Sequence, residues 1–261
     1  MIKIKTPDEI KIMRKACFYA ALILEKMKKA VKPGISTYYL DQIGRNLMKS
    51  YGVTSACYNY KSQNSKNLFP AYTCLSVNEE VVHGIGSMKC ILQEGDIISI
   101  DVCINYKGYI GDNAQTIPVG KISNIKKQLL DCAEKALIKG ISQARNNKTV
   151  GDISQAIQSY IEKFKFSVVK DFVGHGIGKN MHEEPQIPNF GQSGSGPKLK
   201  PGMIIAIEPM VNMISSDIEC APDGWTTLSI DRQPSAHFEH TVLITENNNE
   251  ILTTLKNNYI E

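Results

Sequence analysis

The sequence lacks the features that mark several common classes of protein. Its seven cysteines are scattered and contain no CxxC pair, which argues against a zinc ribbon or a disulfide framework and favours reduced thiols in a cytoplasmic protein. The N-terminus has no apolar signal core, and the apolar run at 17–24 is too short to span a bilayer. The glycine-rich stretch at 191–198 lacks the GK[ST] ending of a phosphate-binding loop, so we expect a surface loop there. We therefore predict a soluble cytoplasmic protein with no membrane partner.

The composition is that of an ordinary folded chain. With 261 residues and 42% hydrophobic content, the chain can bury a substantial core, and we expect a single domain over 1–261. The net charge of +4 is mildly basic, and much of the excess lies between Lys3 and Lys29. A solvated helix face explains this run, and a weak contact with an acidic partner such as the RNA of the ribosome is the alternative. We expect a monomer without specific DNA binding.

Helix signals occur at corresponding places in two parts of the chain. Thr6 is a candidate N-cap that forms a capping box with Glu9, and Pro7 suits the first helical position. These signals predict a helix that ends by the KPG at 32–34. Apolar residues at helical spacing predict amphipathic helices within 34–52 and 150–166. The two later helices each precede an HGIG sequence, at 83–86 and 175–178.

Each HGIG lies upstream of an apolar strand that carries an unexpected carboxylate. Asp101 closes the run GDIISID, and Glu208 follows PGMIIAI. An edge strand could point one such acid into water, but the repeated pattern favours two related halves, about 1–120 and 121–261. Joined across a pseudo-two-fold axis, these halves would bring the two acids face to face. We predict an α+β fold with helices packed on one side of a sheet in each half.

Three more residues extend this set of candidate ligands. Lys107-Gly108 marks a turn that returns the chain to Asp112, His175 is expected in a glycine-flanked bend, and Glu239 begins another β-rich run. Taken singly, each acid could be a capping or salt-bridge residue. Held together, four carboxylates repel one another unless cations neutralise them. An oxygen-rich set with one imidazole suits a pair of Mn, Fe, Co or Zn ions better than a closed structural zinc site.

The full set of motifs resembles the "pita-bread" metallopeptidases, and most closely their type I methionine aminopeptidases. The resemblance rests on SVNEEVVHGI, GDIISIDV, GYIGDNAQT, VGHGIGKNMHEEP, LKPGMIIAIEPM and FEHTVLIT, which follow in the family's order over essentially the whole chain. It implies an internally duplicated fold with helices outside a central curved antiparallel sheet. It also implies a cytoplasmic hydrolase that removes the N-terminal methionine of nascent proteins when the second residue is small.

The resemblance assigns roles to the candidate residues. It implies that Asp101 binds one of two divalent ions, that His175 and Glu208 bind the other, and that Asp112 and Glu239 bind both. A water held between the ions would attack the peptide carbonyl, with Glu208 as general base.

The resemblance also implies roles outside the ligand set. His83 would contact the scissile amide nitrogen, and His182 would contact the substrate carbonyl. Taken singly, each could instead be an ordinary buried histidine that is hydrogen-bonded within the protein. The implied methionine pocket consists of Cys57, Tyr60, Cys74, Met181 and Trp225.

Some segments depart from the family pattern. The stretch 61–69 is longer and more polar than expected, Asn113 replaces a serine or threonine, and Gly86 replaces a proline. Two rival functions stay open: an Xaa-Pro aminopeptidase or prolidase of the same fold, and a non-catalytic relative that binds peptide or nucleic acid. The rival peptidases usually carry an added N-terminal domain, and the non-catalytic relatives generally lose metal ligands.

Overall fold

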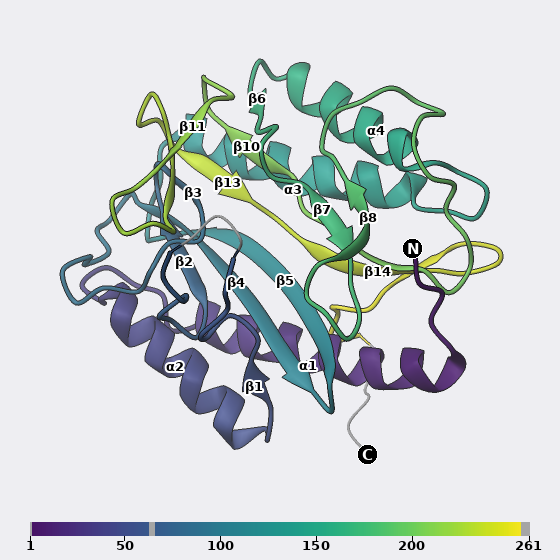
Figure 1. Ribbon diagram of the computed structural model, residues 1–261. Helices are drawn as coiled ribbons and strands as arrows, with labels where there is room; N and C mark the ends of the chain where they lie inside the picture. Colours follow the sequence, from purple (N-terminus) through teal and green to yellow (C-terminus); the bar gives the residue numbers. More distant parts are fainter. Residues whose placement is uncertain (1, 63–65, 257–261) are drawn as a thin grey trace.

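The computed structural model describes residues 2–62 and 66–256. Within these residues the helices are α1 (Pro7–Lys28), α2 (Thr37–Ser50), α3 (Asn124–Gln143) and α4 (Val150–Glu162). None of these described helices is both long and apolar enough to cross a membrane. The helices lie in two pairs, with α1 and α2 along one part of the molecule and α3 and α4 along another (Figure 1).

The helix boundaries follow from local capping. Thr6 and Glu9 form the predicted capping box of α1, with Pro7 as its first residue, and a second capping box between Thr149 and Asp152 begins α4. Ser36 caps α2 by accepting from the backbone N–H of Tyr39. The first helix ends at Lys28, one turn before the predicted KPG stop. Helix α4 likewise ends at Glu162 rather than near 166.

All strand pairs of the described chain are antiparallel. The first sheet contains β1 (Thr54–Ser55), β2 (Cys74–Val77), β4 (Ile97–Tyr106) and β5 (Tyr109–Pro118). A five-stranded sheet runs in the order β15 (Asn249–Ile251), β14 (His240–Ile244), β9 (Ile204–Ile207), β7 (Gly174–Gly176) and β8 (Glu183–Ile187). One small sheet contains β13 (Ser235–His237), β10 (Met210–Asn212) and β6 (Ser167–Val168). A second small sheet contains β11 (Ile218–Cys220), β12 (Thr227–Ser229) and β3 (Glu80–Val82).

Hydrogen bonds join the two halves of the chain directly. The backbone N–H of Glu239 donates to the carbonyl of Ala114 at 2.9 Å, and the hydroxyl of Thr241 donates to the carbonyl of Asp112 at 2.7 Å. We call this contact between β5 and the segment 237–241 the central seam. Because the seam joins residues more than 120 positions apart in the chain, it places side chains of both halves in one region.

The apolar core is divided in the same way as the helices. One buried cluster surrounds α3 and α4, with members such as Leu137 and Ile157, and another surrounds α1 and α2, with members such as Ile23 and Leu40. A third cluster lies between them and contains Met13, Trp225 and other residues. The observed α+β fold, with helices outside antiparallel sheets, confirms the predicted fold class.

One strand differs from its predicted extent. Asp101 was expected to close its strand, but β4 continues to Tyr106, so Asp101 lies at the middle of the strand. The run VCINY after Asp101 pairs along its length with β5, which extends the ladder beyond the acid. The predicted surface loop at 191–198 is largely exposed, although Gly151 and Asp152 of α4 hydrogen-bond to it.

Candidate active site

The hairpin β4–β5 positions the first two acids. Lys107 and Gly108 have φ values of 52° and 82°, the left-handed conformations that a tight hairpin turn requires. The resulting register pairs Asp101 with Ala114 and Cys103 with Asp112. Paired residues of an antiparallel ladder lie on one face, as do residues two apart on one strand, so the two acids are diagonal neighbours on the same face.

The second half supplies the other candidate ligands to the same face. His175 lies at the centre of the short strand β7, between Gly174 and Gly176, rather than in a bend. Glu208 directly follows β9, and Glu239 directly precedes β14. Since β9 and β14 pair with Ile207 opposite His240, these two glutamates come next to each other at the end of the ladder.

The five candidate ligands converge on one cavity of about 720 Å³. Ligand atoms of Asp112, His175 and Glu239 all lie within 4.8 Å of one another, and these three residues are buried. Nε2 of His175 lies 3.3 Å from Oε1 of Glu208. Nδ1 of His175 lies 3.0 Å from the carbonyl oxygen of Gly176, so in the neutral ring it donates there and leaves the Nε2 lone pair facing the acids.

The carboxylates have no cationic side chain to neutralise them. In the described part of the chain, none of the four acids forms an ion pair with lysine or arginine. One oxygen each of Asp101, Asp112 and Glu239 is buried and has no hydrogen-bond partner in the described part of the chain. Such orphaned charged atoms are costly, and oxygen donors of this kind with one imidazole are suitable ligands for divalent metal ions. The residues present therefore fit a metal centre.

The electrostatics of the acids follow from burial and crowding. Burial raises the pKa of Asp101 well above its usual range, and the neighbouring charge of Asp112 raises it further. Burial is also the main cause that raises the pKa of Asp112 and of Glu239. Burial acts in the same direction on Glu208, but the adjacent imidazoles of His237 and His175 outweigh it and lower its pKa.

Three further histidines face the cavity. His83 has a φ of 60°, and the following Gly84 packs so closely on Leu75 that a Cβ would lie 2.3 Å from its carbonyl oxygen. The ring of His182 lies edge-on to His175 with 4.5 Å between centroids, and its Nδ1 lies 2.8 Å from the hydroxyl of Tyr60. Desolvation by the surrounding chain, and then His175, lower the pKa of His182 to about 4.

His237 is a residue that the sequence interpretation missed. Its Nε2 is buried without a hydrogen-bond partner and lies 3.6 Å from Oε2 of Glu208, which is too long for a hydrogen bond. Its position in HFEH was a usable signal. In extended chain it is two residues before Glu239 and therefore shares its face.

The structure places all five candidate pocket residues on the cavity wall, namely Cys57, Tyr60, Cys74, Met181 and Trp225. Phe69 also lines the cavity, with its ring edge-on to Trp225 at 5.2 Å. The segment 61–69 departs from the family pattern, and its residues 63–65 lie outside the described residues. Cys103 and Phe172 line the cavity as well and were not predicted from the sequence.

Comparisons with known proteins identify the family of this chain. The model of metallopeptidase family M24 matches residues 11–246. Methionine aminopeptidase 1 of Bacillus subtilis is 48% identical over 97% of this chain and 99% of its own length. A methionine aminopeptidase of Clostridium perfringens is 46% identical over 98% of this chain and 100% of its own length.

Solved structures show the same relationship. A crystal structure of methionine aminopeptidase from Rickettsia prowazekii superposes with a TM-score of 0.93 at 40% identity, covering 97% of this chain and all of that one. A prolidase from Pyrococcus furiosus superposes with a TM-score of 0.76 at 24% identity and matches 66% of its own length, a likeness of fold alone. The pita-bread fold predicted from the sequence is thereby confirmed.

Proposed function

The chain belongs to metallopeptidase family M24, and on that premise we propose that it hydrolyses the first peptide bond of substrates that begin with methionine. It is a metal-dependent aminopeptidase that removes the N-terminal methionine, like its relatives of 42–48% identity over nearly the full length. The observation that carries this function is the convergence of four carboxylates and His175 on a cavity of about 720 Å³, with no lysine or arginine partner among the described residues. We further propose that residues 1–261 form one catalytic domain with related halves at about 1–120 and 121–261.

Divalent metal ions are the expected cofactors of this family. We propose two ions per chain, of Co, Mn, Fe or Zn. Asp101 would hold one ion, His175 and Glu208 the other, and Asp112 and Glu239 would contact both. When bound, such ions supply a water of lowered pKa and positive charge beside the substrate carbonyl.

The chain's own residues would then orient the substrate and move protons. Glu208, whose pKa stays low, is deprotonated at neutral pH and serves as general base before it passes the proton to the leaving amine. His83 holds the scissile amide nitrogen. His182 donates to the substrate carbonyl from Nε2 if the hydroxyl of Tyr60 donates to its Nδ1 across the 2.8 Å contact.

The cavity wall would select the side chain of the first residue. Cys57, Cys74 and Trp225 are buried, and Tyr60 and Met181 are partly exposed, so sulfur atoms and ring edges surround the space. These are favourable contacts for the long, polarisable side chain of methionine. A small second residue would be preferred because the shape of the cavity excludes larger side chains at that position.

The setting of the reaction is also a proposal. The substrates would be nascent polypeptides in the cytoplasm, and the enzyme would act as a monomer. A weak contact with the ribosome would involve the basic face of α1, where Lys11 and Lys15 lie among the charged residues.

Peptide hydrolysis tests the function against its rivals. Protein loaded with manganese or cobalt should release methionine from Met-Ala-Ser, release little from Met-Trp-Ser, and leave Ala-Pro-Gly intact. Cleavage of Ala-Pro-Gly alone would instead establish an Xaa-Pro peptidase, and binding of all three peptides without turnover would establish a non-catalytic relative.

Anomalous scattering tests the metal centre separately. Crystals soaked in manganese should show two peaks among the five candidate ligands. Asp112→Asn should abolish both peaks and turnover, because this residue is proposed to contact both ions. A single peak, or two peaks that persist in the variant, would contradict the proposed ligand assignment.

A further inference from the structure

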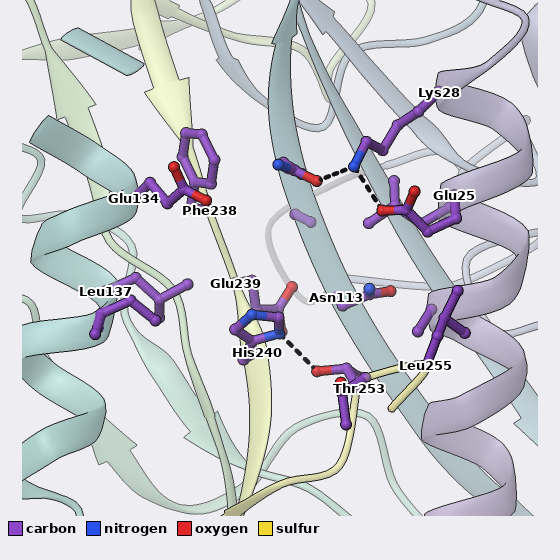
Figure 2. Close-up of a pocket in the computed structure, with 16 residues that line it drawn as sticks. Glu25, Lys28, Asn113, Glu134, Leu137, Phe238, Glu239, His240, Thr253 and Leu255 are labelled. Atoms are coloured by element: carbon purple, nitrogen blue, oxygen red, sulfur yellow. Dashed lines mark hydrogen bonds and ion pairs between the residues drawn. The ribbon is translucent and has the colours of Figure 1, made fainter. Parts of the chain in front are cut away.

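A second cavity lies behind the central seam, between α1 and α3 (Figure 2). It encloses about 340 Å³, and we call it the back pocket. Successive residues of a strand point to opposite faces, so Asp112 lines the catalytic cavity and the next residue, Asn113, lines the back pocket. His240, one residue after Glu239, also lines it, and Glu239 itself lines both cavities.

Asn113 provides an unused polar group in this pocket. The residue is 3% exposed, and its Oδ1 is buried without a hydrogen-bond partner among the residues that the structure describes. Buried amides are almost always hydrogen-bonded in folded proteins. An amide can present either its oxygen or its NH₂ group after a flip, so Asn113 can bond a hydroxyl in either role.

His240 offers a second polar group beside it. The hydroxyl oxygen of Thr253 accepts from the backbone N–H of Thr241 at 3.2 Å and lies 2.8 Å from Nδ1 of His240. If the hydroxyl donates to Nδ1, the proton of the neutral ring is on Nε2. Figure 2 shows this contact at the floor of the pocket, near Asn113.

The walls and the rim have different chemistry. Leu24 of α1, Leu137 of α3 and Phe238 form apolar walls, and all three are buried. Glu25, Lys28 and Glu134 at the rim are more exposed than these walls. Lys28 contacts Glu25 at 2.5 Å and Gln115 at 2.6 Å, so its charge is already compensated.

Glu134 is the remaining charge at the rim. It is exposed on α3, lies across the pocket from Lys28 in Figure 2, and has no ion pair within the described residues. With two carboxylates and one ammonium the rim carries a net negative charge, which favours a cationic group there.

We propose that the back pocket binds a small aromatic amine with a hydroxyl group at the end opposite its ammonium. The hydroxyl would bond to Asn113 and Nε2 of His240, the ring would lie between Leu137 and Phe238, and the ammonium would face Glu134. Binding there would order the two residues that adjoin Asp112 and Glu239 in the chain, so the ligand would act on strands that carry candidate metal ligands.

Three probe molecules test this chemistry in the metal-free full chain, where no ion can bind amines in the catalytic cavity. Tyramine should bind with one molecule per chain by calorimetry and shift the NMR signals of residues around Asn113. Phenethylamine, which lacks the hydroxyl, should bind about tenfold more weakly because a buried hydrogen bond is lost. 3-(4-Hydroxyphenyl)propionate, with a carboxylate in place of the ammonium, should not bind measurably.

Variants locate the site. Leu137→Trp should fill the pocket and abolish tyramine binding, whereas Ile125→Trp, at an exposed position on the same helix, should leave it unchanged. Glu134→Gln is a surface change that should not disturb folding, and it should weaken the binding of tyramine severalfold. Absence of tyramine binding, or equal binding to the wild type and to Glu134→Gln, would overturn the proposal. These readouts do not use peptide hydrolysis, so their failure is distinguishable from failure of the proposed function.

Discussion

Replacing Lys5 with methionine should destabilise the protein because it breaks a buried ion pair. Nζ of Lys5 lies 2.6 Å from Oε2 of Glu183, and the two side chains are 5% and 4% exposed. Gly178 allows this contact, since a Cβ there would lie 2.6 Å from Cε of Lys5. The pair ties the N-terminal segment to the turn that carries Met181 and His182. Its loss should therefore affect both stability and the candidate site.

The size of the effect follows from burial. Removing one partner of a buried ion pair leaves an uncompensated charge and typically costs about 3–5 kcal/mol. Lys3 approaches Oε1 of Glu183 at 3.4 Å, but its side chain is 55% exposed, so it can compensate only in part. We expect about 3 kcal/mol for Lys5→Met at pH 7, at the lower end of that range.

The effect should depend on pH in a defined direction. Burial raises the pKa of Glu183, but hydrogen bonding and charge from Lys5, together with the N–H of Asn180, outweigh it and lower the pKa. A lowered pKa in the folded state contributes stability above the unfolded pKa, and that contribution is lost as pH falls through the folded value. In the variant, Glu183 can become neutral at acidic pH. The difference in unfolding free energy should therefore shrink between pH 7 and pH 4.5.

Urea unfolding of metal-free protein measures these free energies. Lys5→Met and Glu183→Met should each destabilise, and the double variant should be more stable than either because no buried charge remains. Arg232→Met is the control: Arg232 and Glu219 are 48% and 46% exposed, so breaking that pair should cost less than about 1 kcal/mol. If the double variant loses as much as the two single variants together, the buried charge is not the cause.

Further outcomes concern the candidate site. In metal-free protein the pKa values of Asp101, Asp112 and Glu239 are raised, so the folded state binds more protons than the unfolded state. The melting temperature should therefore fall as pH rises from 5 to 8. Saturating manganese should reverse that trend in the same thermal melts. Asp112→Asn should raise the melting temperature of metal-free protein by removing a buried charge, yet abolish the increase that manganese gives the wild type. His182→Ala should lower kcat by about 10²–10³ while leaving the manganese-induced increase in melting temperature intact, as steady-state kinetics and melts on one preparation would show.

Local signals predicted much of the fold because their physics is local. The capping box of Thr6 and Glu9, the turn at Lys107 and Gly108, and the strand that carries Glu208 each depend on a few neighbouring residues. The end of β4 was not predictable in this way. Its residues beyond Asp101 are in a strand because β5 pairs with them, and that pairing depends on where the hairpin turns.

The site shows the same division. Sequence motifs identified the five candidate ligands and the two histidines at 83 and 182 through their resemblance to a family, and the structure places them around one cavity. The role of each ligand stays a prediction. His237 was missed although its spacing from Glu239 was a usable signal, because the sequence does not show which face of this short segment meets the cavity.

The sequence by itself determined the chemistry available to this protein: acids in or beside apolar strands, imidazoles beside glycines, and helices with defined starts. Only the tertiary structure decided that Asp112 and Glu239 come together, since the contact depends on backbone hydrogen bonds across the central seam between distant segments. It also decided that Asn113 and His240 share a pocket on the opposite face. The physical reason is that alternation along a strand fixes which residues share a face, whereas the packing of the two halves fixes what each face meets.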